Sequence, residues 1–543
     1  MKTKKQSNKK NKLHLEIQKH RVNPYGLLRS SARENGKVIH QTHARLVGLE
    51  LGTLLLIQAA LQGNVVKKSD FKIEISREYG ASLAVYQLAK NLGLDKAIYS
   101  RTNEPWVKDC LAMIIGKLVY AGSKLSLTNI NKDSALWEIC GIHDPDIDVN
   151  IHCYAAMDKL KERQEAIQKY LAKKHLEDGT LILYDITSSY LEGEYEKSEL
   201  VAFGYNRDMK KGHEQIVIGL MCGKDGCPIS VEVFKGNTKD EQTVLDKVAD
   251  LKKKYNLKTF VFVGDRGMLT KLNLEEIQKD EYIKTISALT HPQIKELCHD
   301  GRVQFSLFDE KNIVEIIEGN HRYALCMNPA VQQKTRQQRS ALLEKTKQAL
   351  EKLARSKRAV EDGKLGIRIG KVINQYKMSK FVDVTIKDQH FTWNFNTEKI
   401  ANEEKLDGCY VISSDVSSEE MTIVEVVENY KKLMNVEQAF RNLKTTRLEI
   451  RPIYHRTDER IACHVFICML AYYLMWHMKK MLSPILADDT NVGRMREYTF
   501  THIMERLKSI RVEKADFDGI KYEMITDRDA EQAKILKLLG VKM

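Results

Sequence analysis

The sequence predicts an α/β protein in which a mixed β-sheet with flanking helices is split by an insertion and is preceded by a helical region. Helical periodicity dominates the chain up to about residue 175. From residue 180 short β-branched runs alternate with helical spacing, and a long charged helical stretch then interrupts the strands. This order of patterns indicates helices first and a divided α/β core after them.

Composition sets the broad class of the protein. The chain has 543 residues, with 87 Lys and Arg against 73 Asp and Glu, so its net charge of +14 suits a protein that binds a polyanion. An ordinary basic cytoplasmic protein fits that charge about equally well. The low numbers of glycines and prolines, 29 and 8, exclude collagen-like and low-complexity architectures.

The first segment, residues 1–20, is predicted to be a disordered basic tail. Its first twelve residues contain six lysines and no acidic residue. No apolar segment of the kind found in secretory signals follows it, so we expect a cytoplasmic protein.

Residues 21–178 are predicted to form a helical region that binds DNA. Apolar runs with helical periodicity occupy residues 49–61, 81–92, 106–120 and 154–171, and the first two end at glycines. We find no clear helix-turn-helix pattern, so a plain helical scaffold is an equally good interpretation of any one of these helices.

Residues 179–290 are predicted to form the first part of the core. Strands are expected at 180–187, 216–222, 228–234, 259–264 and 282–289, with a tight hairpin turn at Gly223–Gly226 and a helix over 240–255. Strand, hairpin, helix, strand, helix and strand is the element order of an RNase H-like sheet.

The second part of the core is predicted at 408–480, after an insertion over 291–407. The insertion combines strand-like runs with the charged helix 332–359, and the core resumes with a strand at 408–413 and one long helix over 418–447. The apolar run 461–478 contains two histidines and is interpreted as a buried helix rather than a membrane span. Residues 481–543 are expected to be a helical C-terminal region.

The ten cysteines are scattered along the chain without C-x-x-C or paired Cys/His spacing. Several lie in apolar runs, where cysteine behaves as a small hydrophobic residue. Neither disulfides nor a zinc site is therefore predicted.

Three carboxylates are predicted to meet at one site. Asp185 and Asp265 each follow an apolar strand, and acids at the ends of adjacent strands can converge on one metal ion. A single aspartate in such a place is more often a cap or turn residue. The third acid is Glu437, which shares a helix face with Tyr430, Arg441 and Lys444 beside an apolar packing face. A solvated face of mixed charge is the alternative for these helix residues.

Clustered carboxylates with basic neighbours suit phosphoryl transfer by two metal ions. Hard oxygen ligands favour Mg²⁺ or Mn²⁺, and two such ions would activate a water or a 3′-hydroxyl and stabilise the leaving oxygen. The predicted cofactor is therefore a pair of Mg²⁺ or Mn²⁺ ions bound by Asp185, Asp265 and Glu437.

Four ordered motifs resemble the bacterial insertion-sequence DDE transposases that carry the signature Tyr-x₂-Arg-x₃-Glu-x₆-Lys. The motifs are YDITSSY around Asp185, FGYNRDMKKGH at 203–213, VGDRGM at 263–268 and Y-x₆-E-x₂-F-R-x-L-K at 430–444. Leu433 stands at the signature's Arg position, so that role is unassigned or has moved to Lys432 or Arg441.

The resemblance implies a catalytic triad of Asp185, Asp265 and Glu437 and a reaction on double-stranded DNA in a synaptic homodimer, with no membrane partner. The enzyme would bind the inverted-repeat ends of its element, excise it and join the 3′ ends to target DNA in the bacterial cytoplasm. Residues expected to contact DNA phosphates are Tyr430, Lys444, Arg441, Arg266, Lys210 and Lys211.

The insertion resembles that of members which cut through a hairpin intermediate, where a flipped base must be stacked on an aromatic ring. Trp393 is the candidate for that role, although a core tryptophan is the plainer interpretation, and a structural role is preferred for His213. Two other functions remain open: an RNase H-fold DNA nuclease without strand transfer, and a catalytically inactive DNA-binding regulator derived from a transposase.

Overall fold

The computed structural model describes most of the chain. The described residues are 12–19, 23–34, 37–62, 71–208, 210, 212–299, 313–355, 361–445, 448–487, 498–517 and 520–543. They form two compact units, of which the first combines 1–85, 129–143 and 482–543, and the second combines 86–128 and 144–481.

The first unit contains two antiparallel three-stranded sheets. One has the order β1 (Leu13–Gln18), β2 (Tyr25–Glu34), β3 (Lys37–Leu46), and the other has the order β16 (Ile520–Ile525), β15 (Arg511–Phe517), β4 (Phe71–Glu78). Its helices are α1 (Leu51–Gln62), α6 (Leu136–Ile139), α18 (Phe500–Lys508) and α19 (Ala530–Leu538).

These strands correct three predictions. β1 lies inside the predicted tail 1–20, whose residues 1–11 fall outside the described residues. β2, β3 and β4 lie in the region 21–178 that was expected to be helical, and β15 and β16 lie in the C-terminal region 481–543. The reason is visible in β3, which is exposed at nearly every position and therefore lacks the alternation of apolar and polar residues that marks a half-buried strand.

The helices predicted before the core are present. α1 matches 49–61, and the boundary between the two units falls within α2 (Gly80–Asn91), which matches 81–92. The other helices of this region are α3 (Leu94–Ile98), α4 (Pro105–Tyr120), α5 (Lys124–Asn129), α7 (Ala155–Glu162) and α8 (Gln164–His175). The run 154–171 therefore forms two helices, which separate at Arg163.

The second unit is built on an eight-stranded mixed sheet, which confirms the predicted α/β class. Its order is β10 (Ile313–Glu318), β11 (His321–Met327), β14 (Cys409–Ser414), β9 (Ile283–Ala288), β8 (Phe260–Val263), β5 (Thr180–Tyr190), β6 (Gln215–Gly223), β7 (Pro228–Lys235). β5, β8 and β9 are parallel, and β6 is antiparallel to β5. This order is consistent with an RNase H-like sheet.

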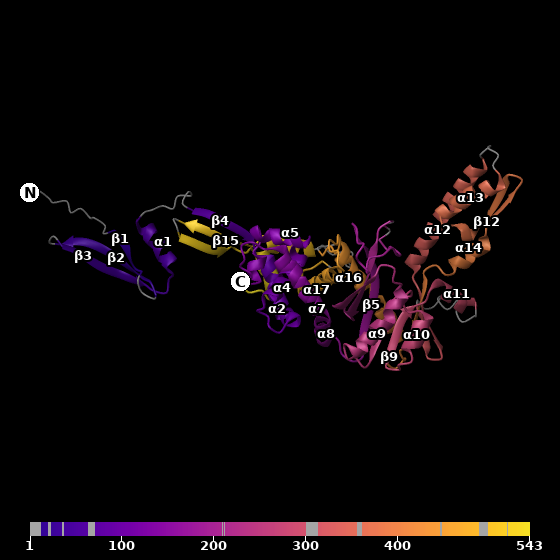
Figure 1. Cartoon of the computed structure of the whole chain (residues 1–543), viewed down its shortest axis with the longest axis horizontal. Helices are drawn as coiled ribbons and strands as arrows, with labels where there is room; N and C mark the ends of the chain where they lie inside the picture. Colours follow the sequence, from indigo (N-terminus) through magenta and orange to yellow (C-terminus); the bar gives the residue numbers. More distant parts are fainter. Residues whose placement is uncertain are drawn as a thin grey trace, which may run out of the picture. The chain divides into compact units, whose positions relative to one another are not determined.

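The centre of the sheet is apolar because both of its faces are covered. Ile182, Leu183 and Tyr184 of β5 are fully buried, and the two aliphatic side chains each contribute about 1.5–3 kcal/mol to folding. α8 packs against β7, where Gln168 accepts a hydrogen bond of 2.9 Å from the Val231 amide. α9 (Val244–Lys253) and α10 (Lys271–Ile277) pack against each other, and α10 also packs against β9 (Figure 1).

The apolar helix α17 (Asp458–Leu482) is buried, as predicted. Among the described residues it is the one unbroken helix that is long and apolar enough to cross a membrane, and 89% of its apolar window lies inside the protein. Its low amphipathicity has the same cause, since a helix that is covered on all sides needs no polar face.

A small subdomain is inserted between β11 and β14. It contains α12 (Pro329–Ala354), α13 (Asp362–Gln375), the hairpin β12 (Val382–Lys387) and β13 (His390–Phe395), and α14 (Thr397–Glu404), which lie together in Figure 1. Its core includes Leu350, Leu365, Ile369, Ile373 and Phe381. We call residues 329–404 the inserted subdomain.

The predicted insertion 291–407 began too early. Its first part contains α11 (His291–His299), followed by β10 and β11, which belong to the core sheet. β11 pairs with β14 over six residues, from Arg322↔Ser414 to Met327↔Cys409. Long-range pairing of this kind is invisible in the local pattern, which can mark a run as strand-like but does not show the strand with which it pairs.

Candidate active site

Asp185 and Asp265 are brought together by the register of two parallel strands. The last pair between β5 and β8 is Leu183↔Val263, and each aspartate follows its member of that pair by two residues. Side chains two residues apart point to the same face of a strand, so the register carries both carboxylates to one place. Asp265 lies beyond the end of β8, as predicted, whereas β5 continues to Tyr190 through its pairing with β6, so Asp185 lies inside its strand and not at its end.

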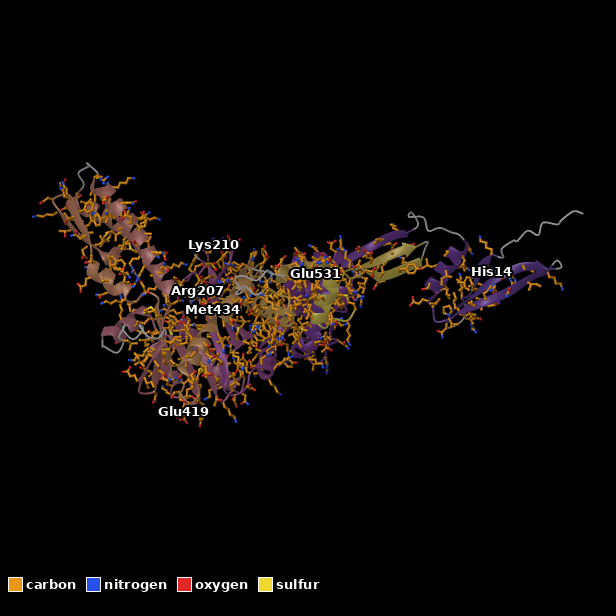
Figure 2. The ribbon with its side chains drawn as sticks, turned by 180° about the vertical axis from the view of Figure 1, so that it is seen from behind. His14, Arg207, Lys210, Glu419, Met434 and Glu531 are labelled. Carbon is orange, nitrogen blue, oxygen red and sulfur yellow. The ribbon has the colours of Figure 1, made fainter. Side chains whose placement is uncertain are left out.

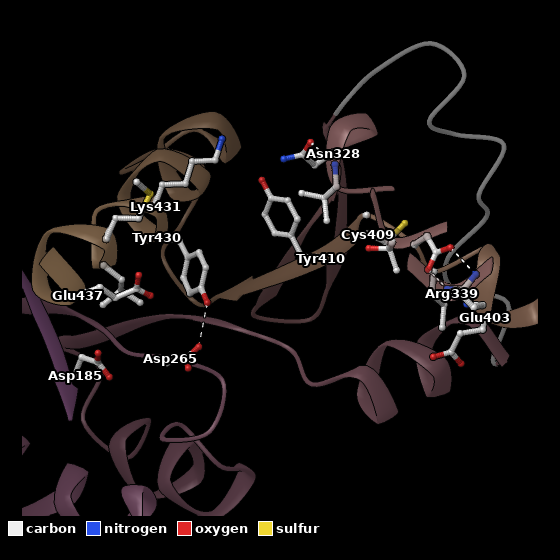
Figure 3. Close-up of a pocket in the computed structure, with 17 residues that line it drawn as sticks. Asp185, Asp265, Asn328, Arg339, Glu403, Cys409, Tyr410, Tyr430, Lys431 and Glu437 are labelled. Atoms are coloured by element: carbon white, nitrogen blue, oxygen red, sulfur yellow. Dashed lines mark hydrogen bonds and ion pairs between the residues drawn. The ribbon is translucent and has the colours of Figure 1, made fainter. Parts of the chain in front are cut away.

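Glu437 reaches the same place from the helical side. It lies on α16 (Leu433–Thr445), which packs against β5 and β6 through buried residues that include Val436, Phe440 and Leu443. Glu437, Asp185 and Asp265 line one cavity of about 540 Å³ and lie close to one another in Figure 3. We call these three residues the carboxylate site.

Backbone amides orient both aspartates. Asp185 Oδ1 accepts a hydrogen bond of 2.8 Å from the Ile186 amide, and Asp265 Oδ1 accepts one of 2.7 Å from the Arg266 amide. The Tyr430 hydroxyl donates a further bond of 3.3 Å to Asp265 Oδ1, drawn as a dashed line in Figure 3. All of these hydrogen bonds reach Oδ1, so the Oδ2 atoms of Asp185 and Asp265 can take a further ligand.

The site concentrates negative charge. Burial, together with repulsion from Asp265 and Glu437, raises the pKa of Asp185 to about 7. Three carboxylates provide only hard oxygen donors, the set that Mg²⁺ and Mn²⁺ prefer, and a divalent cation would relieve the repulsion among them. The donor set therefore fits a divalent metal site.

Lys444 lies beside the carboxylates and is held by two oxygens. Its Nζ lies 2.7 Å from Thr187 Oγ1, two residues after Asp185 on the same face of β5, and 3.1 Å from Asp208 Oδ1. Arg451 Nη1 donates to the other oxygen of Asp208 at 2.8 Å. Burial lowers the pKa of Lys444, an effect that the charge of Asp208 opposes.

The long helix predicted over 418–447 is two helices. α15 (Ile423–Lys431) carries Tyr430, and α16 begins at Leu433 after a break at Lys432. Tyr430 and Glu437 therefore lie on different helices, although both line the cavity. Lys432 Nζ donates to Asn429 Oδ1 at 2.6 Å, and Leu433 is buried in the cavity wall.

A comparison with known protein families identifies the family of the chain that carries these residues. The model of the transposase DDE domain matches residues 178–474, more than half of the chain. The chain belongs to this transposase family. A search of curated proteins found no match.

A DDE transposase is a nuclease-type enzyme of DNA recombination, so DNA is the partner of this chain and divalent metal ions are its general cofactor. The matched region covers the whole carboxylate site and the strands that carry it. The predicted assignment to DNA transposition and to a mobile element is confirmed at this level.

The other described residues that were predicted to contact DNA lie on α16 and on two loops of the second unit. Arg266 follows Asp265 and is exposed, and Arg441 is exposed on α16. Lys210 lies on the loop between β5 and β6, where Figure 2 labels it with Arg207, and its Nζ lies 4.6 Å from the centre of the Tyr190 ring. Lys211 lies outside the described residues.

Trp393 is not brought to the carboxylates. It lies on β13 of the inserted subdomain, packs against the core of that subdomain and meets Phe395 edge to face at 5.2 Å. The cavity is instead lined by residues that include Asn328, Thr335 and Arg339, and Arg339 forms an ion pair with Asp407, which also lines it. The aromatic residues among its lining are Tyr410 and Tyr430.

Asp208, Thr187 and Arg451 are site residues that sequence reasoning did not single out. Two of them lie inside quoted motifs, since Asp208 is part of FGYNRDMKKGH and Thr187 is part of YDITSSY, whereas Arg451 lies seven residues after Lys444. A hydrogen-bond network links them. Lys444 and Thr187 are 257 positions apart in the sequence, and Arg451 and Asp208 are 243 positions apart. Spacing along the chain does not reveal such a link.

Proposed function

We propose that the chain is the transposase of a bacterial insertion sequence, in the group that bears the Tyr-Arg-Glu-Lys signature. It binds the inverted-repeat ends of its element, excises the element and joins the 3′ ends to target DNA. The observation that supports this proposal best is the strand register that sets Asp185 beside Asp265, with Glu437 lining the same cavity.

In this proposal Asp185, Asp265 and Glu437 hold two Mg²⁺ or Mn²⁺ ions. When bound, the metal activates a water or a 3′-hydroxyl and stabilises the leaving oxygen. Tyr430 orients the Asp265 carboxylate through its hydroxyl, and the Ile186 and Arg266 amides fix the two aspartates. The protein thus presents its oxygen donors in place before DNA enters.

Lys444 is proposed to hold a phosphate close to the reacting bond. Its contact with Thr187 fixes the ammonium group two residues from Asp185 on β5, while Asp208 keeps the buried charge compensated before DNA binds. Arg266, Arg441, Lys210 and Lys211 would contact phosphates further along the duplex and supply the salt-dependent part of affinity.

We further propose that the reaction takes place in a synaptic homodimer on double-stranded DNA and proceeds through a hairpin. In that scheme one strand is cut, its free 3′-hydroxyl attacks the other strand, and water reopens the hairpin before joining. Trp393 would stack the flipped base in this scheme, although the packing of its partly buried ring against the core of the inserted subdomain argues against that role.

Cleavage of supercoiled DNA that carries the candidate inverted repeats tests the function. With Mg²⁺, wild type should give excised and joined products, whereas the Asp185→Asn variant should bind the ends and cut nothing. Nicking without joined products would identify a nuclease, and binding without cleavage by wild type would identify a regulator.

A further inference from the structure

Two histidines and a cysteine from distant parts of the chain meet in the second unit. His175 is the last residue of α8, Cys227 lies in the turn between β6 and β7, and His477 lies near the end of α17. One ligand atom of each residue lies within 4.8 Å of those of the other two. We call these three residues the Cys/His cluster.

The cluster is held in place by its neighbours. His175 Nε2 lies 2.9 Å from the Tyr473 hydroxyl, and the His477 ring meets Tyr473 and Trp476 edge to face, with ring centres at 4.6 and 4.9 Å. Cys227 is 1% exposed. These contacts leave the three side chains little freedom to turn away from one another.

The turn that carries Cys227 is fixed independently of the cluster. Asp225 accepts a hydrogen bond of 3.3 Å on its backbone oxygen from Trp476 Nε1, and its carboxylate lies 3.5 Å from Lys480 Nζ. At Gly226, whose φ is +82°, an added Cβ would lie 2.8 Å from Asn435 Cβ on α16. The turn is therefore pressed between α16 and α17, and the cysteine position is set by backbone packing.

Two ligand atoms of the cluster have no strong hydrogen-bond partner among the described residues. His477 Nε2 is buried and has no hydrogen-bond partner among the residues that the structure describes. An unpaired buried nitrogen destabilises a fold, so its retention in a core needs an explanation such as an ion. The contact of Cys227 Sγ is a weak one, 4.0 Å to the Pro228 carbonyl oxygen.

One nitrogen of the His175 ring is left for a ligand. With Nε2 of His175 tied to Tyr473, its Nδ1 is the nitrogen left for a ligand, which is the usual arrangement of a metal-bound histidine and its outer partner.

We propose that His175, Cys227 and His477 bind one zinc ion, which joins α8, the β6–β7 turn and α17. One thiolate and two imidazoles form a borderline-soft donor set that suits zinc far better than Mg²⁺ or Mn²⁺. Binding releases the thiol proton of Cys227 to solvent as the Zn–S bond forms, and no electron is transferred. Three protein ligands leave the fourth tetrahedral position to water.

Cobalt(II) is the probe that tests the site, because thiolate bound to cobalt gives a charge-transfer absorption that oxygen ligands do not give. The full-length protein, freed of metal with a chelator and carrying Asp185→Asn to weaken the carboxylate site, is titrated with Co²⁺ and then with Zn²⁺. We expect the thiolate band to saturate at one cobalt per chain and to disappear when one equivalent of zinc is added.

Two cysteines in the same hairpin give a matched pair of variants. Cys227→Ala should abolish the band, whereas Cys222→Ala, which removes an equally buried thiol from β6, should keep it. His477→Gln should weaken cobalt binding at least about tenfold while the far-ultraviolet circular dichroism stays that of wild type. No thiolate band in the Asp185→Asn protein, or an equal band in Cys227→Ala, would overturn the proposal, whatever the cleavage assay shows.

Discussion

The carboxylate site and the Cys/His cluster lie in the same unit but are built in opposite ways. The first has half-buried and exposed oxygen donors around an open cavity, and its two aspartates come from paired neighbouring strands. The second has nitrogen and sulfur donors among aromatic rings, and each comes from a different element. The two proposals together assign Mg²⁺ or Mn²⁺ to the oxygen donors and zinc to the nitrogen and sulfur donors, so the donor chemistry of each site would select its own metal.

The largest expected effect is that of Glu437→Gln. The amide keeps the shape of the side chain but loses a charged oxygen donor, so Mg²⁺-dependent cleavage of end DNA should fall by about 10³-fold or more. Binding of the ends, measured by gel shift, should stay within severalfold of wild type.

Glu428→Gln is the matched control for this exchange. Glu428 is an exposed glutamate on α15 that does not line the cavity, so its loss should leave cleavage unchanged. Wild-type activity in Glu437→Gln would remove Glu437 from the carboxylate site.

Metal removal separates the two sites. Chelation should abolish cleavage, and Mg²⁺ or Mn²⁺ alone should restore it because only the oxygen donors of the carboxylate site take part in the reaction. Zinc alone should raise the melting temperature of the metal-free protein without restoring cleavage. Restoration by zinc alone would contradict this division of roles.

Asp208→Asn tests the network beside the carboxylates. The exchange leaves Lys444 and Arg451, which both donate to Asp208, without their shared counter-charge, and we expect a loss of about 1–3 kcal/mol in the free energy of unfolding. Thermal unfolding measures the loss, and bound DNA should reduce it because a backbone phosphate replaces the missing carboxylate. An unchanged melting temperature would show that the network carries no net stability.

The most local expected effect concerns Trp393, because it is confined to the inserted subdomain. Since its ring is half-buried against the core of the inserted subdomain, Trp393→Ala should destabilise that subdomain by about 1–3 kcal/mol, seen as faster amide exchange in α13 and β12. Trp393→Phe should preserve most of this packing. If hairpin formation slows in Trp393→Phe while amide exchange stays normal, Trp393 stacks a base after all.

Much of the core could be predicted because its signals are local. The apolar β-branched run 180–187 lies within β5, and the run 259–264 contains β8 and one residue on each side of it. The hairpin turn predicted at Gly223–Gly226 joins β6 to β7. The apolar face of α16 also packs as expected. A strand that is exposed at nearly every position, such as β3, gave no such signal.

The sequence by itself determined a basic chain with two aspartates after apolar strands and a glutamate on a helix, and its motifs carried the resemblance to DNA transposases. Only the tertiary structure decided the register that aligns Asp185 with Asp265, the network of Lys444, Thr187 and Asp208, and the meeting of His175, Cys227 and His477. The physical reason is that periodicity encodes burial within one element, whereas ligand geometry depends on how separate elements pack.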